Sequence, residues 1–444
     1  MNHWKPFLAF EEQHDLFQLK EKDLYIWDIV RFHIYLDYMW ENFEEQKSRK
    51  TLFSKIKLSF KRIGYLFTFL FKRSRPNLFF TNARDKTPDG RFFDKNADDF
   101  LQRLYPDSHI IETYQEGSSR YVYPVSLINP VGLFKKLYYL LHRDKDYTPL
   151  LGKINTSLGL SWDNKKINRC ISDFKCEKLF YSLLFRFKKT KRIYVTQNGL
   201  QKALFCAARA HNIETVEFQH GIIDKGHIAY NYPASITTQS HIYIPDLLLT
   251  FSEFWGQDIN YPVKRIVAVG NTGFANLDVQ DKVFNPQGKV VGFISADVFG
   301  LKLADLAKEY ATIHKNDLIL FKLHPNEFAR KKEYTGYFSE YPNIQVITNE
   351  QPTEKIVLSC DAIVLIQSTI AYQALQAGIQ LFIYKRMTYY RHSHIFHNPN
   401  VHLVDNARQI VPGAQFIRKT AEGPVQVFFE RFNESAYHLL ANFN

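Results

Sequence analysis

The sequence predicts an α/β fold built on open parallel sheets in two domains. Two observations lead to this prediction. The chain has 444 residues, more than one hydrophobic core usually serves. Short apolar runs also alternate with segments of helical periodicity, which is the pattern of strands joined by helical crossovers. The clearest example of that alternation lies between residues 316 and 378.

This stretch contains the pattern of strand, loop and helix twice. Residues 318–323 are an apolar run that stops at His324-Pro325, because proline cannot continue a central strand. Residues 362–366 are a second apolar run, and Gln367-Ser368-Thr369 follows it. A segment of helical spacing comes next and ends at Gly378, a typical C-cap residue. Ligands of parallel sheets bind at the carboxyl ends of the strands, where both polar clusters stand.

The residue types at these strand ends suit a phosphate group. Ser368 and Thr369 precede a helix, whose first backbone N–H groups favour an anion. His324 offers a ring nitrogen and Lys322 a positive charge. A lone His-Pro is ordinarily a turn, and a lone Ser-Thr is ordinarily an N-cap. Their occurrence on consecutive units of one sheet favours a nucleotide-phosphate site.

The same motifs carry a resemblance to a known group of enzymes. Lys-Leu-His-Pro-Asn-Glu at 322–327, followed by Gln-Ser-Thr at 367–369 and Gln-Ala-Leu-Gln-Ala-Gly at 373–378, resembles the C-terminal half of GT-B glycosyltransferases. The most similar set is the bacterial capsule and lipopolysaccharide enzymes. It includes polysialyltransferase-like and β-Kdo transferase-like proteins and the related glycerophosphate polymerases. The similarity covers residues 190–400.

The resemblance implies a GT-B fold, in which two Rossmann-like domains face each other across a cleft. It implies transfer of a sugar from a CMP- or UDP-linked donor to a bacterial surface glycan, such as capsule, O-antigen or lipooligosaccharide. The partners would be the nucleotide-sugar and an oligosaccharide or lipid-linked acceptor. The donor-binding set that we predict is Lys322, His324, Glu327, Gln367, Ser368, Thr369, Ser295 and Gly270.

The N-terminal half offers the candidates for catalysis. A strand at residues 76–82 is followed by a polar loop that carries Asp89 and Asp94. A later strand, residues 215–218, delivers Gln219-His220-Gly221, and similar stretches face the cleft in the resembling enzymes. We predict His220, Asp89 and Asp94 as catalytic candidates, and Gln219, Gly221 and Asn198 as cleft residues. An acidic pair precedes glycine at the base position of the polysialyltransferase-like set, and Pro88-Asp89-Gly90 matches this only in part.

The predicted domain boundaries follow from these elements. Residues 1–274 form an acceptor-side Rossmann-like domain with a basic helical N-terminal region, and residues 289–423 form the donor-binding domain. Residues 275–288, rich in Asn, Asp, Pro and Gly, are the linker between them. Residues 424–444 form a helix that packs back across the junction.

Composition and charge indicate the environment. The net charge of +12 favours an anionic partner, such as a nucleotide, a nucleic acid or an acidic lipid surface. Residues 47–75 combine ten basic side chains with many aromatic ones and no acidic one, which suits an anionic membrane surface or a core helix with a solvated basic face. The four cysteines form no Cys-x-x-Cys pair, which indicates free thiols in a reducing cytosol. The first ten residues have no signal-peptide pattern. We therefore expect a cytoplasmic protein, peripheral at the inner face of the cytoplasmic membrane.

No cofactor or metal is expected. The Asp-x-Asp sequence that metal-using glycosyltransferases supply occurs at residues 144–146, away from any predicted strand end. Residues 385–397 form a basic, histidine-rich loop that would contact phosphate or acceptor. Two rival functions stay open: transfer of glycerol or ribitol phosphate from a CDP donor, and a binding protein for nucleotides or nucleic acid. No RNA-binding signature supports the second.

Overall fold

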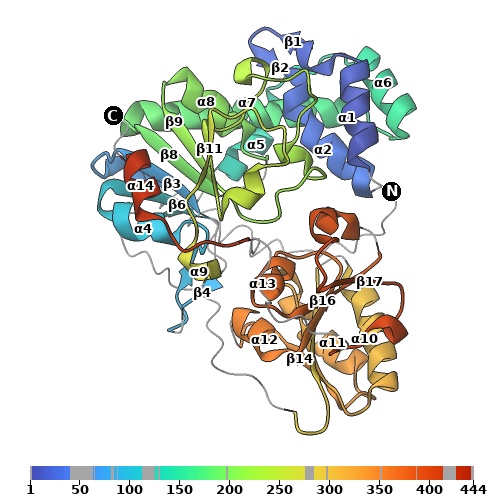
Figure 1. The fold of residues 1–444 in the computed structure, drawn as a ribbon. Coiled ribbons are helices and arrows are strands. Elements are labelled where there is room, and N and C mark those ends of the chain that lie inside the picture. Colours follow the sequence, from blue (N-terminus) through green and yellow to red (C-terminus); the bar gives the residue numbers. More distant parts are fainter. Residues whose placement is uncertain are drawn as a thin grey trace. The chain divides into compact units, whose positions relative to one another are not determined.

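The computed structural model describes residues 3–40, 64, 66–81, 85–87, 89–112, 126–128, 131–196, 199–275, 285–296, 299–350, 353–386, 388–413 and 427–441. The chain divides into two compact units, which we describe one at a time (Figure 1). Unit 1 comprises Met1–His220, Lys225–Thr250 and Asp258–Ala268. Unit 2 comprises Gly221–Asp224, Phe251–Gln257 and Val269–Asn444.

Unit 1 contains a seven-stranded parallel sheet in the order β11-β10-β9-β8-β3-β6-β7. Its first strand in the chain, β3, lies inside the sheet, and later strands are added first on one side and then on the other. This is the doubly wound Rossmann order. The strands are β3 (Asn77–Thr81), β6 (Ser108–Glu112), β7 (Ser126–Ile128), β8 (Arg192–Thr196), β9 (Glu214–Phe218), β10 (Leu247–Thr250) and β11 (Arg265–Ala268).

Unit 2 repeats this design with six parallel strands in the order β14-β13-β12-β15-β16-β17. The strands are β12 (Val290–Ile294), β13 (Leu318–Lys322), β14 (Ile344–Ile347), β15 (Ala362–Leu365), β16 (Gln380–Tyr384) and β17 (Val401–Val404). The chain winds from β12 toward β14 and then returns to β15 on the opposite side of β12. The predicted α/β class with two Rossmann-like parallel sheets is confirmed.

Helices cover the sheets. In unit 2, α10 and α11 lie on one side and α12 and α13 on the other (Figure 1). The helices of unit 1 are α1 (Trp4–Gln13), α2 (Ile26–Trp40), α4 (Asp98–Leu104), α5 (Val131–Leu140), α6 (Thr148–Leu158), α7 (Asn164–Lys188) and α8 (Lys202–Ala210). Those of unit 2 are α9 (Thr272–Ala275), α10 (Gly300–Ile313), α11 (Lys331–Tyr337), α12 (Thr353–Ser359), α13 (Ile370–Gln376) and α14 (Glu434–Ala441).

Several predicted helices have different ends in the structure. The sequence of residues 164–192 predicts a basic amphipathic helix, but the helix stops at Lys188, because Lys189 takes a left-handed conformation and β8 follows. The sequence of residues 131–145 also predicts a basic amphipathic helix, which stops at Leu140 in the structure. Gly378, predicted as the C-cap of its helix, has a φ of +74° and follows Ala377, the C-cap of α13, so it ends the helix from one residue beyond the cap. Residues 121–123, whose sequence suits a short strand, lie outside the described residues.

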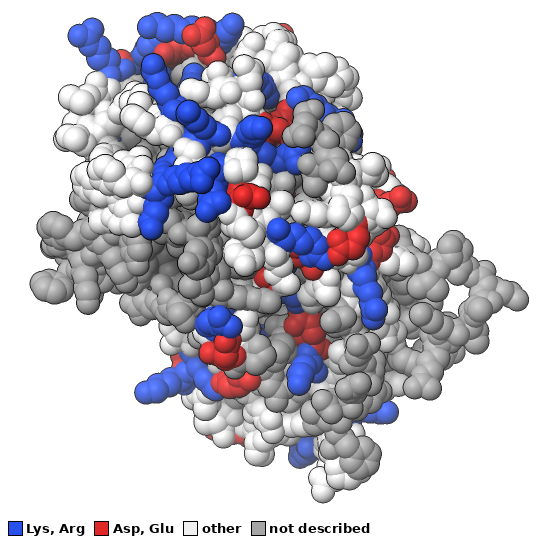
Figure 2. All heavy atoms as spheres, turned by 90° about the vertical axis from the view of Figure 1, so that its left-hand side faces the viewer, with Lys and Arg blue, Asp and Glu red and all other residues white. Residues whose placement is uncertain are grey.

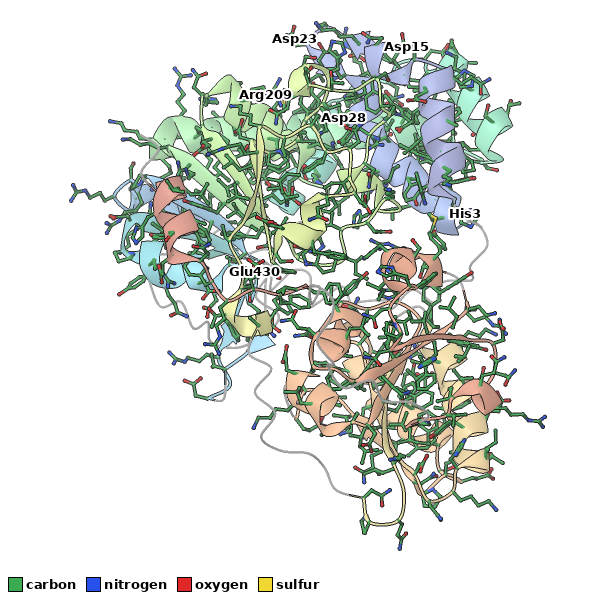
Figure 3. The ribbon with its side chains drawn as sticks, in the orientation of Figure 1. His3, Asp15, Asp23, Asp28, Arg209 and Glu430 are labelled. Carbon is green, nitrogen blue, oxygen red and sulfur yellow. The ribbon has the colours of Figure 1, made fainter. Side chains whose placement is uncertain are left out.

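A buried polar network ties the N-terminal helices to the rest of unit 1. Arg31 on α2 and Glu11 on α1, each 1% exposed, form a bidentate pair with N–O distances of 2.7 and 2.8 Å. Arg31 also donates to the carbonyl oxygens of Ile228 and Asn231. Asp28, labelled inside this unit in Figure 3, accepts from Lys202 at 2.8 Å. Since each buried charge has a partner, the network holds α1 and α2 against the loop after β9.

Residues 427–433 form an extended strap in unit 2, where the sequence predicted a helix from residue 424. The strap's backbone is used elsewhere: the Glu430 N–H donates to Phe251 O, and Glu430 O accepts from the Asn271 N–H. The Gln376 side chain accepts from the Phe428 and Phe429 N–H groups and donates to Phe429 O. These bonds replace those of a helix, which begins only at Glu434.

A substitution at Gly270 tests how closely this strap packs against the chain. It has a φ of +71°, and a Cβ there would lie 2.1 Å from Arg431 O. Gly413, in the same unit, has a φ of +89° but meets only the Lys289 side chain, at 3.6 Å. Both changes to alanine carry the cost of a left-handed residue, about 1–2 kcal/mol. Gly270→Ala should cost roughly 1–3 kcal/mol more because of the backbone overlap. Thermal and denaturant unfolding measure the loss of stability in both variants. Equal losses would contradict the close packing of the strap against Gly270.

Candidate functional site

The register of unit 2 brings three chain segments to one edge of its sheet. Ile294 of β12 pairs with Lys322 of β13 on one side and with Leu365 of β15 on the other. The residues that follow these three therefore emerge together at the carboxyl ends of neighbouring strands. Because the chain winds away from β12 in both directions, this edge is the topological switch point of the sheet, where ligands of such folds bind.

His324 begins the turn after β13. Its Nδ1 accepts a hydrogen bond from the Asn326 N–H at 3.2 Å. A backbone N–H only donates, so the neutral ring carries its proton on Nε2. Pro325 follows at the first position of a short 3-10 helix, Pro325–Arg330, and fixes the direction of the turn. His324 therefore presents a hydrogen-bond donor at the switch point.

Glu327 and Ser295 face each other inside the unit. Glu327 is fully buried, and its carboxylate accepts from the Ser295 hydroxyl, the Tyr334 hydroxyl and, at 3.2 Å, the His324 N–H. Ser295 is only 3% exposed. Because Ser295 bonds to Glu327 and Glu327 bonds to the His324 N–H, both residues help to position His324. Direct contact of either with a donor stays a prediction.

Gly300 explains how helix α10 approaches this carboxylate. A Cβ at Gly300 would lie 2.0 Å from Glu327 Oε1 and 2.2 Å from the Tyr334 hydroxyl oxygen. Only glycine leaves room for the buried acid at the start of the helix. The negative charge lies where the helix dipole is positive, which lowers the cost of burying it.

Lys322 is the buried cation of the site. It is 4% exposed, its Nζ donates to Leu323 O at 3.2 Å, and it lies 4.8 Å from the centroid of the Phe328 ring. Burial lowers the pKa of Lys322 to about 8, although Glu350 and Glu354 oppose the shift. The ammonium is therefore charged below pH 8 and loses its proton readily above it.

Ser368 and Thr369 form the turn between β15 and α13. Ser368 Oγ accepts from the Ile370 N–H at 3.3 Å, and Ser368 O accepts from the Ala371 N–H. The Ser368 N–H donates to His392 Nε2 at 3.2 Å. Among the described residues we find no acceptor for the Thr369 N–H. The turn thus offers one backbone N–H, that of Thr369, and two hydroxyls to a ligand. These are fewer backbone donors than the sequence suggested. Gln367 precedes it, half-buried.

The His392 contact belongs to a chain of bonds that the sequence did not predict. His392 Nδ1 lies 3.2 Å from the Tyr372 hydroxyl oxygen, which lies 2.6 Å from His394 Nε2. Arg391 donates to Asp224 Oδ1 at 2.9 Å and to Ile222 O. The histidine-rich loop stands out in the sequence, but Tyr372 is indistinguishable there from a core residue of a helix.

Gly270, the last predicted donor-site residue, has a structural reason to be glycine. The chain's own strap lies against it, at Glu430 and Arg431. The prediction was that glycine at this position lets the chain approach the donor closely, whereas the structure shows the backbone of Glu430 and Arg431 against it. A contact between Gly270 and a donor stays a prediction.

The cleft residues predicted in the N-terminal half fall in different places. Gln219 is 1% exposed and its N–H donates to Leu249 O within the sheet of unit 1. His220 is half-buried at the end of β9. Gly221, the first residue counted with unit 2, has open space where a Cβ would stand. Asn198 lies outside the described residues.

The two aspartates differ in their suitability as a base. Asp89 is exposed beside the hairpin of β4 (Asp85–Lys86) and β5 (Phe92–Phe93). Hydrogen bonds from Thr87 and Arg91 lower the pKa of its carboxyl, which weakens it as a base. Asp94 is fully buried, and its Oδ1 accepts from the Asn96 N–H at 3.0 Å before α4.

The side chains that could bind a metal do not gather in one place. Among the described residues no group of three or more His, Cys, Asp or Glu side chains is arranged to hold an ion. In the Asp-x-Asp sequence, Asp146 accepts from the Thr148 N–H at 2.9 Å, in the turn that precedes α6. The expectation of a metal-independent reaction stays a prediction.

The chain is similar to known proteins in fold alone. No family model matches it, and no curated protein matches it significantly. Among solved structures, it is similar to the UDP-GlcNAc 2-epimerase of Neisseria meningitidis bound to UDP-GlcNAc, with 11% identity, 75% of this chain and 88% of that chain covered, and a TM-score of 0.46. It is similar to the glycotransferase of kitacinnamycin, with 10% identity, coverages of 77% and 88%, and a TM-score of 0.44. It is also similar to MurG of Acinetobacter baumannii, with 8% identity, coverages of 76% and 87%, and a TM-score of 0.39. At these values the likeness carries no argument about the activity of this chain.

Proposed function

We propose that the protein is a glycosyltransferase that moves a sugar from a nucleotide-activated donor, CMP- or UDP-linked, to a bacterial surface glycan. The observation that carries the proposal is the position of His324 and of Ser368-Thr369. They stand on either side of β12, at the switch point of a nucleotide-fold sheet. An Nε2–H donor, a backbone N–H and two hydroxyls at one edge suit the oxygen atoms of a phosphate.

The departing nucleotide leaves with negative charge that must be stabilised. In this proposal Lys322, His324 and the Thr369 N–H supply that stabilisation in place of a divalent ion, since prepositioned donors need no reorganisation during the reaction. A base of unit 1 takes the acceptor proton in an inverting reaction. His220 is favoured over Asp89, whose lowered pKa makes it a weak base, and over Asp94, which is buried.

A panel of CMP-, UDP-, GDP- and CDP-linked donors tests the proposal. We expect hydrolysis or transfer of one nucleotide-sugar, with turnover nearly intact in excess EDTA. Turnover only of CDP-glycerol or CDP-ribitol would support the polyol-phosphate alternative. Binding of nucleotides or nucleic acid without turnover of any donor would support the non-enzymatic one. Loss of activity in EDTA that magnesium or manganese restores would contradict the metal-independent site.

Variants at the strand ends test the site itself. His324→Ala, and separately the double change Ser368→Ala/Thr369→Ala, should weaken donor binding roughly 10- to 100-fold, because each removes hydrogen bonds to a charged group. His314→Ala is the matched control: it removes a partly exposed histidine before β13, at the opposite end of the same strand. Calorimetry measures the affinities and thermal unfolding the stability. Equal affinity in the site variants and the control would refute the assignment.

We also propose peripheral contact with an anionic membrane. The basic aromatic segment at residues 47–75 lies mostly outside the described residues, but its end supports the proposal: Phe67 and Phe71 are 58% and 87% exposed, and the exposed Lys72 and Arg73 follow. Lys and Arg outnumber Asp and Glu over the described part of one face (Figure 2). Within the described ranges we find no helix long and apolar enough to span a bilayer.

Binding to vesicles tests this contact. Changing Lys55, Lys57, Lys61 and Arg62 to glutamine should release the protein from vesicles that contain phosphatidylserine, since each basic residue contributes about 1 kcal/mol at such a surface. Phe71→Ser should weaken binding as well. Leu301→Ser, which changes a 43% exposed side chain on α10, is the control and should bind normally. Unchanged sedimentation of the glutamine variant would indicate a core helix with a solvated face.

A further inference from the structure

We propose that His392 is a positioning residue for the donor, a neutral imidazole that holds the Ser368-Thr369 turn in its ligand-binding conformation. The inference rests on the proposed function, because it concerns the same phosphate site. His392 lies in the 3-10 helix Tyr389–Ile395 after β16, twenty-four residues from the turn in sequence. It acts through Ser368 rather than by contact with the donor.

The direction of every bond in the chain follows from one fixed donor. The Ser368 N–H has no lone pair to offer, so His392 Nε2 must accept from it at 3.2 Å. The proton of the neutral ring is then on Nδ1, which donates to the Tyr372 hydroxyl oxygen at 3.2 Å. That hydroxyl in turn donates to His394 Nε2 at 2.6 Å. A backbone group thus determines the tautomer of His392 and the direction of the bonds beyond it.

The surroundings keep the ring neutral. His392 and Tyr372 are both fully buried, so water does not replace a lost partner. Burial, with the neighbouring His394 and Arg391, lowers the pKa of His392 well below its usual value. Asp224 on the adjoining segment is already paired with Arg391. A second proton on the ring would sit on Nε2 and point at the Ser368 N–H, so a charged His392 cannot hold the turn.

The bond decides which groups remain for a ligand. With the Ser368 N–H held by His392 and Ser368 Oγ held by the Ile370 N–H, the hydroxyl proton of Ser368 is directed away from the backbone. The Thr369 N–H and hydroxyl stand beside it. Without the imidazole, the Ser368 N–H loses its buried acceptor and the turn is free to rotate. The donor then meets a turn whose two hydroxyls are not prepositioned.

Two variants of His392 separate this role from simple packing. His392→Phe keeps an aromatic ring of similar size but removes the acceptor, and should raise the KM for the donor roughly ten-fold or more with a smaller change in kcat. His392→Gln puts an amide oxygen close to the position of Nε2 and should restore most of the affinity. His402→Phe is the control, since it changes a histidine of β17 that stacks on Phe382 in the same unit.

The outcomes distinguish the inference from the function on which it rests. If the wild-type protein binds no donor of the panel, the proposed function fails. If it binds one and His392→Phe binds it equally well, the positioning role is refuted. If His392→Phe and His392→Gln lose the same affinity, the ring serves packing alone, which also overturns the inference. Thermal unfolding of each variant shows whether unit 2 is folded.

A direct measurement does not need the donor at all. In protein labelled with ¹⁵N-histidine, the His392 ring should show a protonated Nδ1 and an unprotonated Nε2 by side-chain NMR from about pH 6.5, the ordinary pKa of histidine, to about pH 8, because the Ser368 N–H fixes this tautomer and the pKa of His392 lies well below its usual value. Tyr372→Phe should change the ratio of the two neutral tautomers of His392, since it removes the acceptor of the Nδ1 proton. The opposite tautomer, or titration of the ring within this range, would contradict these bond directions.

Discussion

The buried carboxylate of Glu327 is the interaction on which the edge of unit 2 at the carboxyl ends of β12 and β13 depends. Burying an isolated carboxylate costs several kcal/mol, and the cost falls only when hydrogen bonds satisfy both oxygens. Glu327 gathers donors from the loop after β12, from the turn after β13 and from α11. Each of these segments is held in place by its hydrogen bond to the Glu327 carboxylate. The edge of the sheet is therefore assembled around a charge that is sealed inside the unit.

The strand ends and the fold class could be predicted from the sequence, whereas the interactions that stabilise them could not. Residues 318–323 and 362–366 are central strands, whose continuous burial produces the apolar runs that predicted them. The edge strands β14 and β17 mix polar and apolar residues, and no pattern in the chain marked them in advance. The strap was mistaken for part of a helix because its partners, such as Phe251 and Gln376, are distant in sequence.

The same limit applied to the site. The positions of His324, Ser368 and Thr369 follow from local motifs, so they were predictable. That Glu327 would be buried was not, because Asn326-Glu327 looks like a solvated turn. The number of N–H groups that the Ser368 turn leaves for a ligand also depended on His392, whose approach requires the whole β16 crossover. Motifs thus located the turns at the strand ends, whereas tertiary packing determined which of their hydrogen-bonding groups are already used within unit 2.

The strap at residues 427–433 has a consequence for how the protein is made. Unit 2 joins residues 221–224 and 251–257 to the chain that starts at residue 269, and the strap bonds to Phe251, Val269 and Asn271. A ribosome completes all of these partners well before it reaches the strap. During synthesis, the aromatic surface around Phe251 and Trp255 stays exposed until Phe428 and Phe429 are made and cover it. Domains that are closed by a segment made later than its partners expose apolar surface in the nascent chain, which is when chaperones bind.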